Sequence, residues 1–242
     1  MGVKNFVPAS ALALPKQHMT PQIDNVSLAI LKGAYNPETK DLIVDLGQLE
    51  IGTLAALLGE DVLKEIPVIK GVVACFKIPL AIRDQLFLRK VAGFLAACPR
   101  FTEAEKKEFL KENLSDEKKA QKLGDSLVLI LDRLDDMEKP EMVARMFAAF
   151  VRGKISFDIF RRLATAIDLG SIADLREFVK IEPTPTTGQR IPLNPQTQLL
   201  RTNLVRTGLV SLPSFSQTVP ITGVSFKENE LGKTFREIMN DN

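Results

Sequence analysis

The chain has 242 residues, which is enough for one large domain or two small ones. Hydrophobic residues make up 45% of it and charged residues 26%, the balance of a globular protein with a buried core. A net charge of +2, a single tyrosine and no tryptophan argue against a surface built for nucleic acid, anionic lipid or sugar stacking, although a local patch could still bind one of them.

The sequence indicates neither secretion nor a zinc site. The apolar run 9–14 is short and lies between Pro8 and Pro15, so we expect a cytoplasmic protein. Cys75 and Cys98 both lie in apolar stretches and no CxxC spacing is present, which favours buried, reduced thiols. A disulfide between them would require their two helices to touch.

Taken in chain order, residues 1–39 are predicted to form a flexible arm and one short helix. Pro8, Pro15 and Pro21 interrupt every apolar run of the arm, which extends to about Gln22. A short helix is predicted over residues 26–35, and the Asn-Pro pair that follows it marks a turn.

Helical signals dominate residues 40–181, which we predict to be a bundle of antiparallel helices. Thr102 and Glu105 fit a capping box, in which each side chain accepts the backbone amide of the other residue. Apolar residues recur at helical spacing between such signals and are expected to face the core. The remaining predicted helix starts are Ser115, Pro140 and Ser156, and the predicted helix ends are Gly153 and Gly170.

Residues 66–82 form the most apolar stretch of the chain. The stretch is bounded by prolines and is about one turn shorter than a membrane-spanning helix. Two interpretations stay open: a buried central helix whose two lysines reach solvent, or a segment that contacts a membrane or a partner protein. The candidate contact residues are Val68, Lys70, Val73, Phe76 and Lys77.

Asp132, Asp135 and Asp136 have the i, i+3, i+4 spacing that places three carboxylates on one face of a continued helix. Such a group can hold a divalent cation when a second element adds ligands. Alternatively, the carboxylates are solvated, and one of them caps the helix that begins near Pro140. We expect no bound metal and no cofactor.

Residues 182–195 are rich in proline and threonine and are predicted to be a linker. Behind it, residues 196–242 are predicted to form a small α/β module. Its elements are a helix over 196–210, short strands over 210–215 and 219–226, and a last helix that begins at Asn229.

The Leu-Val-Arg-Thr-Gly-Leu-Val sequence of residues 204–210 and the Leu-Gly-Lys of residues 231–233 resemble the end of a winged-helix domain. The resemblance implies that Arg201 and Arg206 face DNA phosphates or bases, and that Lys227 or Lys233 supports the wing. The proline-rich linker, however, takes the place of the short turn expected before a recognition helix. Winged helices also serve in protein docking and dimerisation, so a protein partner or a homo-oligomer stays open.

Five segments in residues 66–178 resemble an uncharacterised bacterial helical family: residues 66–69, 82–90, 123–125, 131–136 and 164–168. Together with the winged-helix-like tail, the layout is distantly similar to the abortive-infection alpha family. The resemblance brings no catalytic residue with it. It implies a bacterial protein connected with phage defence, in which the apolar 66–82 stretch is the candidate effector element.

The sequence thus predicts a mainly α protein, a helical bundle followed by a winged-helix-like α/β module. No catalytic residue is assigned, because His18 is the single histidine and lies in the arm, and no phosphate-binding loop is present. The leading hypothesis is a non-enzymatic interaction or effector protein of a bacterial antiviral system, with an unidentified protein partner and with membrane contact by residues 66–82. The alternatives are a winged-helix DNA-binding regulator and a metal-dependent enzyme that uses the aspartate group.

Overall fold

The computed structural model describes residues 21–35, 82–180, 195–211 and 227–241, and these are mainly helical. The candidate contact residues Val68, Lys70, Val73, Phe76 and Lys77 lie outside the described residues, as do Cys75 and most of the predicted arm and linker. The elements in chain order are α1 (Pro21–Ala34), α6 (Ile82–Ala97), α7 (Glu103–Phe109), the π-helix η1 (Leu110–Leu114), α8 (Glu117–Arg133), α9 (Lys139–Val151), α10 (Phe157–Leu169), α11 (Ile172–Lys180), α12 (Pro195–Thr207), β1 (Val210–Ser211), β2 (Lys227–Glu228) and α13 (Glu230–Asn240).

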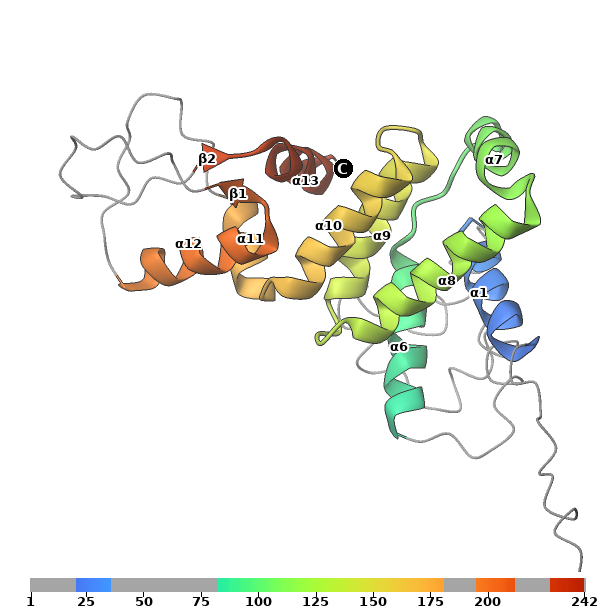
Figure 1. The fold of residues 1–242 in the computed structure, drawn as a ribbon, viewed down its shortest axis with the longest axis horizontal. Helices are drawn as coiled ribbons and strands as arrows, with labels where there is room; N and C mark the ends of the chain where they lie inside the picture. The colour runs from blue at the N-terminus through green and yellow to red at the C-terminus, as the bar shows by residue number, and fades with distance from the viewer. Residues whose placement is uncertain (1–20, 36–81, 181–194, 212–226, 242) are drawn as a thin grey trace, which may run out of the picture.

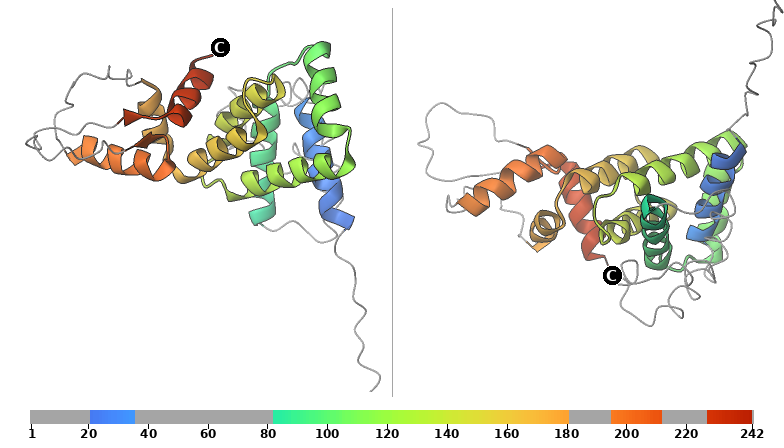
Figure 2. Two further views of the ribbon diagram at one scale, coloured as in Figure 1. Left: turned by 45° about the horizontal axis from the view of Figure 1, so that its top comes forward. Right: turned by 90° about the horizontal axis from the view of Figure 1, so that it is seen from below.

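The helices follow one another along the long axis of the molecule (Figure 1). Helices α1, α7 and α8 lie at one end, α11, α12 and the two strands lie at the other, and α9 and α10 lie between them. The turned views keep this order (Figure 2). Helix α1 packs on α8, α6 packs on α9, and α9 also packs on α10 and α13. None of the described helices is both long enough and apolar enough to cross a bilayer.

Phe147 of α9 lies at the centre of the core and is fully buried. Its ring contacts Phe94 of α6 at 5.6 Å between centroids, Phe109 of α7 at 6.1 Å and Phe160 of α10 at 5.9 Å. All three contacts are edge-to-face, the arrangement that aligns the positive ring edge with a negative ring face. One aromatic side chain therefore joins α9 to three other helices, and the apolar stripes predicted for these helices do face the core.

Helices α1 and α8 approach closely because Gly124 has no side chain. A Cβ at Gly124 would lie 2.8 Å from the carbonyl oxygen of Ser27, which is too close for a real contact. The buried Ser27 hydroxyl donates to Asp125 Oδ1 at 2.6 Å, and Gln121 donates to the same oxygen at 2.8 Å. A glycine and a polar triad thus hold the first helix on α8.

Most of the predicted helix boundaries are confirmed. Thr102 and Glu105 form the predicted capping box, and the Ser156 hydroxyl accepts the amide of Ile159. Gly153 has φ +67° and follows the end of α9, where the amides of Gly153 and Lys154 donate to the carbonyls of Phe150 and Ala149. These two bonds make a Schellman motif, which satisfies carbonyls left open at the helix end.

Two boundary predictions are wrong. Helix α1 begins at Pro21 rather than near residue 26, because a proline is tolerated in the first helical turn, where its missing amide has no partner to lose. Asp116 rather than Ser115 caps α8 and accepts the amide of Lys118. The π-helix η1 carries the right-handed conformation through Ser115 (φ −67°, ψ −23°), so the first extended residue able to cap is the next one.

The C-terminal part consists of α12, the antiparallel pair β1–β2 and α13. Val210 pairs with Glu228 and Ser211 pairs with Lys227, while most of the two predicted strand ranges lies outside the described residues. Asn229 caps α13 as predicted, because its side chain accepts the amide of Gly232 at 2.9 Å. Helices α12 and α13 pack on α10 and α11. The division of the chain into separate domains stays a prediction.

Candidate functional site

The three aspartates do not share one helix face, so the arrangement that the metal alternative required does not form. Helix α8 ends at Arg133, and Leu134 leaves the helical conformation (φ −57°, ψ 132°), so the continued helix is wrong. Asp132 pairs with Arg83 at 2.8 Å, Asp135 pairs with Lys139 at 2.5 Å, and Asp136 accepts the amide of Glu138. Within the described parts of the chain, no group of three or more histidine, cysteine, aspartate or glutamate side chains could hold a metal ion.

These aspartates instead anchor the loop between α8 and α9. Lys139 is only 1% exposed, and its ammonium group donates to Asp135 Oδ1 and, at 2.9 Å, to the backbone carbonyl of Asp168. The hydrogen bond from Lys139 lowers the pKa of Asp135. On the neighbouring helix, Lys90 donates to the carbonyl of Asp132, and burial lowers the pKa of Lys90. The group is a structural ion network that joins α6, α8, α9 and α10.

The structure describes the side chains of two of the four predicted nucleic-acid contacts, Arg206 and Lys233. Arg206 donates to the carbonyl of Leu169 at 2.5 Å, so its guanidinium group caps the C-terminal end of α10. Lys233 is exposed on α13. Both Arg201 and Lys227 have side chains outside the described part of the structure, so the structure does not test their predicted role.

A cleft lies between α7–η1 and the α9–α10 turn. We call it the acidic cleft. It has a volume of about 580 Å³, and its lining includes the carboxylates of Glu105, Glu108 and Glu112 and the rings of Phe109, Phe150 and Phe157. The three glutamates are spaced i, i+3, i+7, which places them on one side of the helical segment. Carboxylates and aromatic rings therefore face the same space.

Only one of these glutamates is engaged by other side chains. Glu105 accepts the amide and hydroxyl of Thr102 and pairs with Arg152 at 3.2 Å. The Thr102 hydrogen bonds and the nearby Arg152 lower the pKa of Glu105. Glu108 and Glu112 are exposed, and neither has an ion pair or hydrogen bond to another side chain among the described residues. Among the residues that the structure describes, these two carboxylates thus have no side-chain partner.

A smaller, mainly apolar pocket of about 170 Å³, which we call the lysine pocket, lies beside the cleft. Asn113, Phe150 and Phe157 line both depressions, so the two are neighbours. Leu123 adds to the apolar wall, and the exposed side chains of Lys119 and Lys122 lie at the edge. The sign of the charge therefore differs between the two neighbouring depressions.

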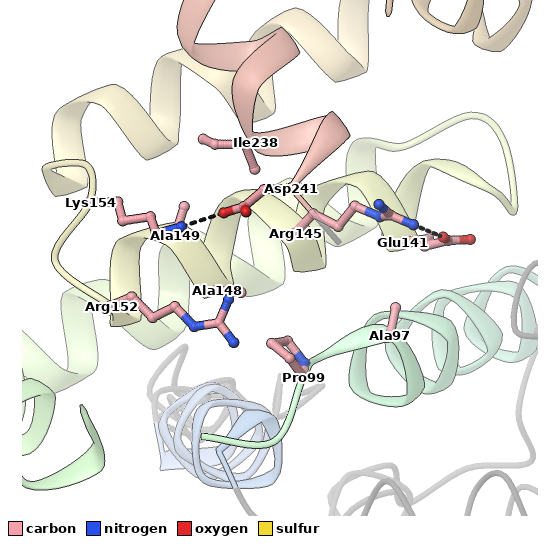
Figure 3. Close-up of a pocket in the computed structure, with 10 residues that line it drawn as sticks. All are labelled: Ala97, Pro99, Glu141, Arg145, Ala148, Ala149, Arg152, Lys154, Ile238 and Asp241. Carbon is pink, nitrogen blue, oxygen red and sulfur yellow. Dashed lines mark hydrogen bonds and ion pairs between the residues drawn. The ribbon is translucent and has the colours of Figure 1, made fainter. Parts of the chain in front are cut away.

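A second groove lies on the other side of Arg152, between the end of α6, helix α9 and the end of α13 (Figure 3). It has a volume of about 270 Å³, and Arg145, Arg152 and Lys154 project along it from α9 and the following turn. Arg145 pairs with Glu141 at 3.2 Å, and Lys154 pairs with Asp241. Because each of the three cations has an acidic partner, this basic groove is close to electrically balanced.

Arg152 is common to the two grooves. Its guanidinium carbon lies 5.9 Å from the centre of the Phe101 ring while its Nε binds Glu105. The Schellman turn fixes the backbone next to Arg152, while the contacts with Phe101 and Glu105 hold its side chain. Arg152 and Glu105 thus form the wall between a balanced groove and a net negative cleft.

Comparison of the chain with protein-family models, with curated proteins and with solved structures gives no match. The acidic cleft was not predicted from the sequence. The i, i+3, i+7 spacing of its glutamates was an available signal for a charged helix face. Two of the three aromatic residues, Phe150 and Phe157, however, come from the distant α9–α10 region, so that part of the lining requires the tertiary structure.

Proposed function

We propose that the protein is a non-enzymatic interaction protein and that the acidic cleft receives a segment of a protein partner. The observation that carries this proposal is the meeting of the Phe150 and Phe157 rings with the unpaired carboxylates of Glu108 and Glu112 in one open depression. Aromatic side chains supply much of the binding free energy in protein interfaces, and unpaired rim charges select the partner and speed its association.

The shape of the surface favours a length of polypeptide over a compact small molecule. The cleft and the lysine pocket share Asn113, Phe150 and Phe157, so their linings together include residues of α7, η1, α8 and the α9–α10 turn. A chain segment can fill both depressions at once, whereas a small ligand held by one of them would leave the other wet.

Site-specific photocrosslinking in cells tests the proposal. A photoreactive residue at Asn113, which lines both depressions, is expected to crosslink one defined protein. The same residue at Thr165, which lines a separate groove between α8 and α10, is the matched control. Loss of the crosslink in a Phe157→Ala background supports docking in the cleft, while identical crosslinks from Asn113 and Thr165 contradict it.

The biological setting that we propose rests on the sequence resemblance to bacterial helical and abortive-infection families. In that setting the protein is cytoplasmic and takes part in phage defence, with residues 66–82 as the element that contacts a membrane or a partner. A plaque assay on cells with and without the gene tests the role in defence. Equal plating of a panel of phages on both would exclude it.

A winged-helix DNA-binding regulator is the second candidate. The order helix α12, antiparallel pair β1–β2 and helix α13 supports this candidate. The engagement of Arg206 with the Leu169 carbonyl weighs against it, since that guanidinium group is already used within the chain. Fluorescence anisotropy with duplex DNA over a salt series decides: a DNA binder loses affinity steeply as salt rises, and Arg201→Ala with Lys233→Ala weakens it further.

A further inference from the structure

We infer that the segment received by the acidic cleft is a cationic amphipathic helix, with lysine or arginine on one side and large apolar side chains on the other. This inference rests on the proposed function and adds the chemistry of the partner. It follows from the arrangement of charge and apolar surface in the cleft.

The carboxylates set the charge of the partner. Glu108 and Glu112 lie four positions apart on one turn of the wall and have no cation among the described side chains. Glu105, beside them, is already neutralised by Arg152 at 3.2 Å. A cationic side chain of the partner would therefore be favoured at the Glu108–Glu112 end of the cleft. An anionic segment would face repulsion there.

The rings set the apolar side of the partner. Phe157 is only partly buried although it packs on Phe150 and Phe160, at centroid distances of 5.7 Å and 6.2 Å. The Arg161 guanidinium also lies over this ring, at 6.0 Å from its centroid, and a leucine or phenylalanine that enters the cleft covers the part of the ring that remains exposed. A helix presents such residues at i, i+3, i+4 and i+7 while it keeps its cationic residues at the edge.

The walls of the cleft suit a helix because they are themselves helical. Helix α7 with η1 forms one wall, and the ends of α9 and α10 form the other. The wider π-turn of η1 makes this wall locally broader. Inside that turn, the side-chain amide of Asn113 donates to the backbone carbonyl of Phe109 at 3.3 Å. Single π-turns within helical segments are frequent at binding sites.

The test uses two synthetic probes and the full ¹⁵N-labelled chain. One probe is an amphipathic leucine–lysine helix of about four turns, and the other replaces every lysine by glutamate. The leucine–lysine peptide is expected to shift the amide signals of residues 105–113 and 150–157. The leucine–glutamate peptide is expected to leave them unchanged.

Glu108→Lys with Glu112→Lys is expected to weaken binding of the leucine–lysine peptide about tenfold and to create binding of the leucine–glutamate peptide. Glu177→Lys with Glu237→Lys makes the same change in net charge on the exposed surface of α11 and α13 and is expected to have little effect. Phe157→Ala is expected to weaken the leucine–lysine peptide without changing its charge preference.

Equal binding of the two peptides, signal shifts confined to other surfaces, or no shifts at all would overturn the inference. The photocrosslink from Asn113 separates this failure from failure of the proposed function. A defined crosslinked protein together with no binding of the lysine probe rejects the cationic helix alone. The absence of any crosslinked protein rejects the interaction itself.

Discussion

Gly232 lies directly against the carbonyl oxygen of Leu209, and the contact leaves no room for a Cβ atom. The same Cβ would lie 3.1 Å from Cζ of the buried Phe178. This contact brings the first turn of α13 onto the end of α12 and the start of β1. The packing of the C-terminal part on the bundle therefore depends on a position without a side chain.

Gly232→Ala is expected to lower the free energy of unfolding by about 1–3 kcal/mol, because the new methyl group must displace backbone. An exposed helical glycine would respond in the opposite direction, since alanine stabilises helices by about 0.5–1 kcal/mol relative to glycine. Urea unfolding measures the difference. Lys233→Ala, one position along on the exposed surface, is the control, and an equally stable Gly232→Ala variant would contradict the close contact.

Phe147→Ala is expected to lower the free energy of unfolding by about 3–5 kcal/mol, because it empties the position where rings from several helices meet. Phe157→Ala is expected to lower it by only about 1–2 kcal/mol, because that ring is partly exposed already. Thermal unfolding of the two variants compares them. Equal losses would mean that Phe157 belongs to the core rather than to the cleft floor.

Asp135 and Lys139 are expected to respond unequally to substitution. Asp135→Ala leaves the ammonium group of Lys139 buried, with the Asp168 carbonyl as its remaining acceptor among the described residues, so we expect a loss of about 1–3 kcal/mol. Lys139→Met removes the buried charge itself and fills a similar volume, so we expect a smaller change or a gain in stability. Chemical denaturation at neutral pH ranks the variants, and a larger loss for Lys139→Met would reverse the argument.

Glu105 makes stability depend on pH in the acid range. Its pKa in the folded chain is lower than 4.5, the value for a free side chain, because it accepts hydrogen bonds from Thr102 and lies beside Arg152. Ionised Glu105 therefore stabilises the fold above pH 4.5, and this contribution is lost as the pH falls through the lower, folded value.

Glu105→Gln is expected to flatten the fall of stability with pH below about pH 4.5 while leaving much of the helix cap, because glutamine also accepts from the Thr102 amide. The effect should stay below about 1 kcal/mol, since the pair with Arg152 is partly exposed to water. Urea midpoints across the acid range measure it. Glu177→Gln on α11 is the control, and a parallel response of the two variants would count against the assigned cause.

The features predicted best from the sequence are those whose causes are local. Thr102 and Glu105, Ser156 and Gly153 define helix ends through bonds that span only a few residues, so the pattern contains nearly all of the required chemistry. The mainly helical character of the described residues followed from periodicity in the same way.

The ion network around Asp132 was not predicted from the sequence, because the partners of Asp132 are distant along the chain. Arg83 and Lys90 reach Asp132 across more than 40 positions, and the helix ends before the second carboxylate. The acidic cleft is equally non-local, since α7 supplies its charge and the α9–α10 turn supplies much of its apolar floor. A one-dimensional pattern does not show which cation or ring a helix face will meet.

Helix α9 has consequences for the order in which the protein is made. Nearly all of its side chains are buried, and its neighbours are α6 and α7, which precede it, and α10 and α13, which follow it. In a nascent chain that ends at Val151, the apolar helix α9 can therefore pack only against the helices that precede it. The face turned toward α13 is covered only after residues 230–240 have been synthesised, so the burial of α9 is completed by the last helix of the chain that the structure describes.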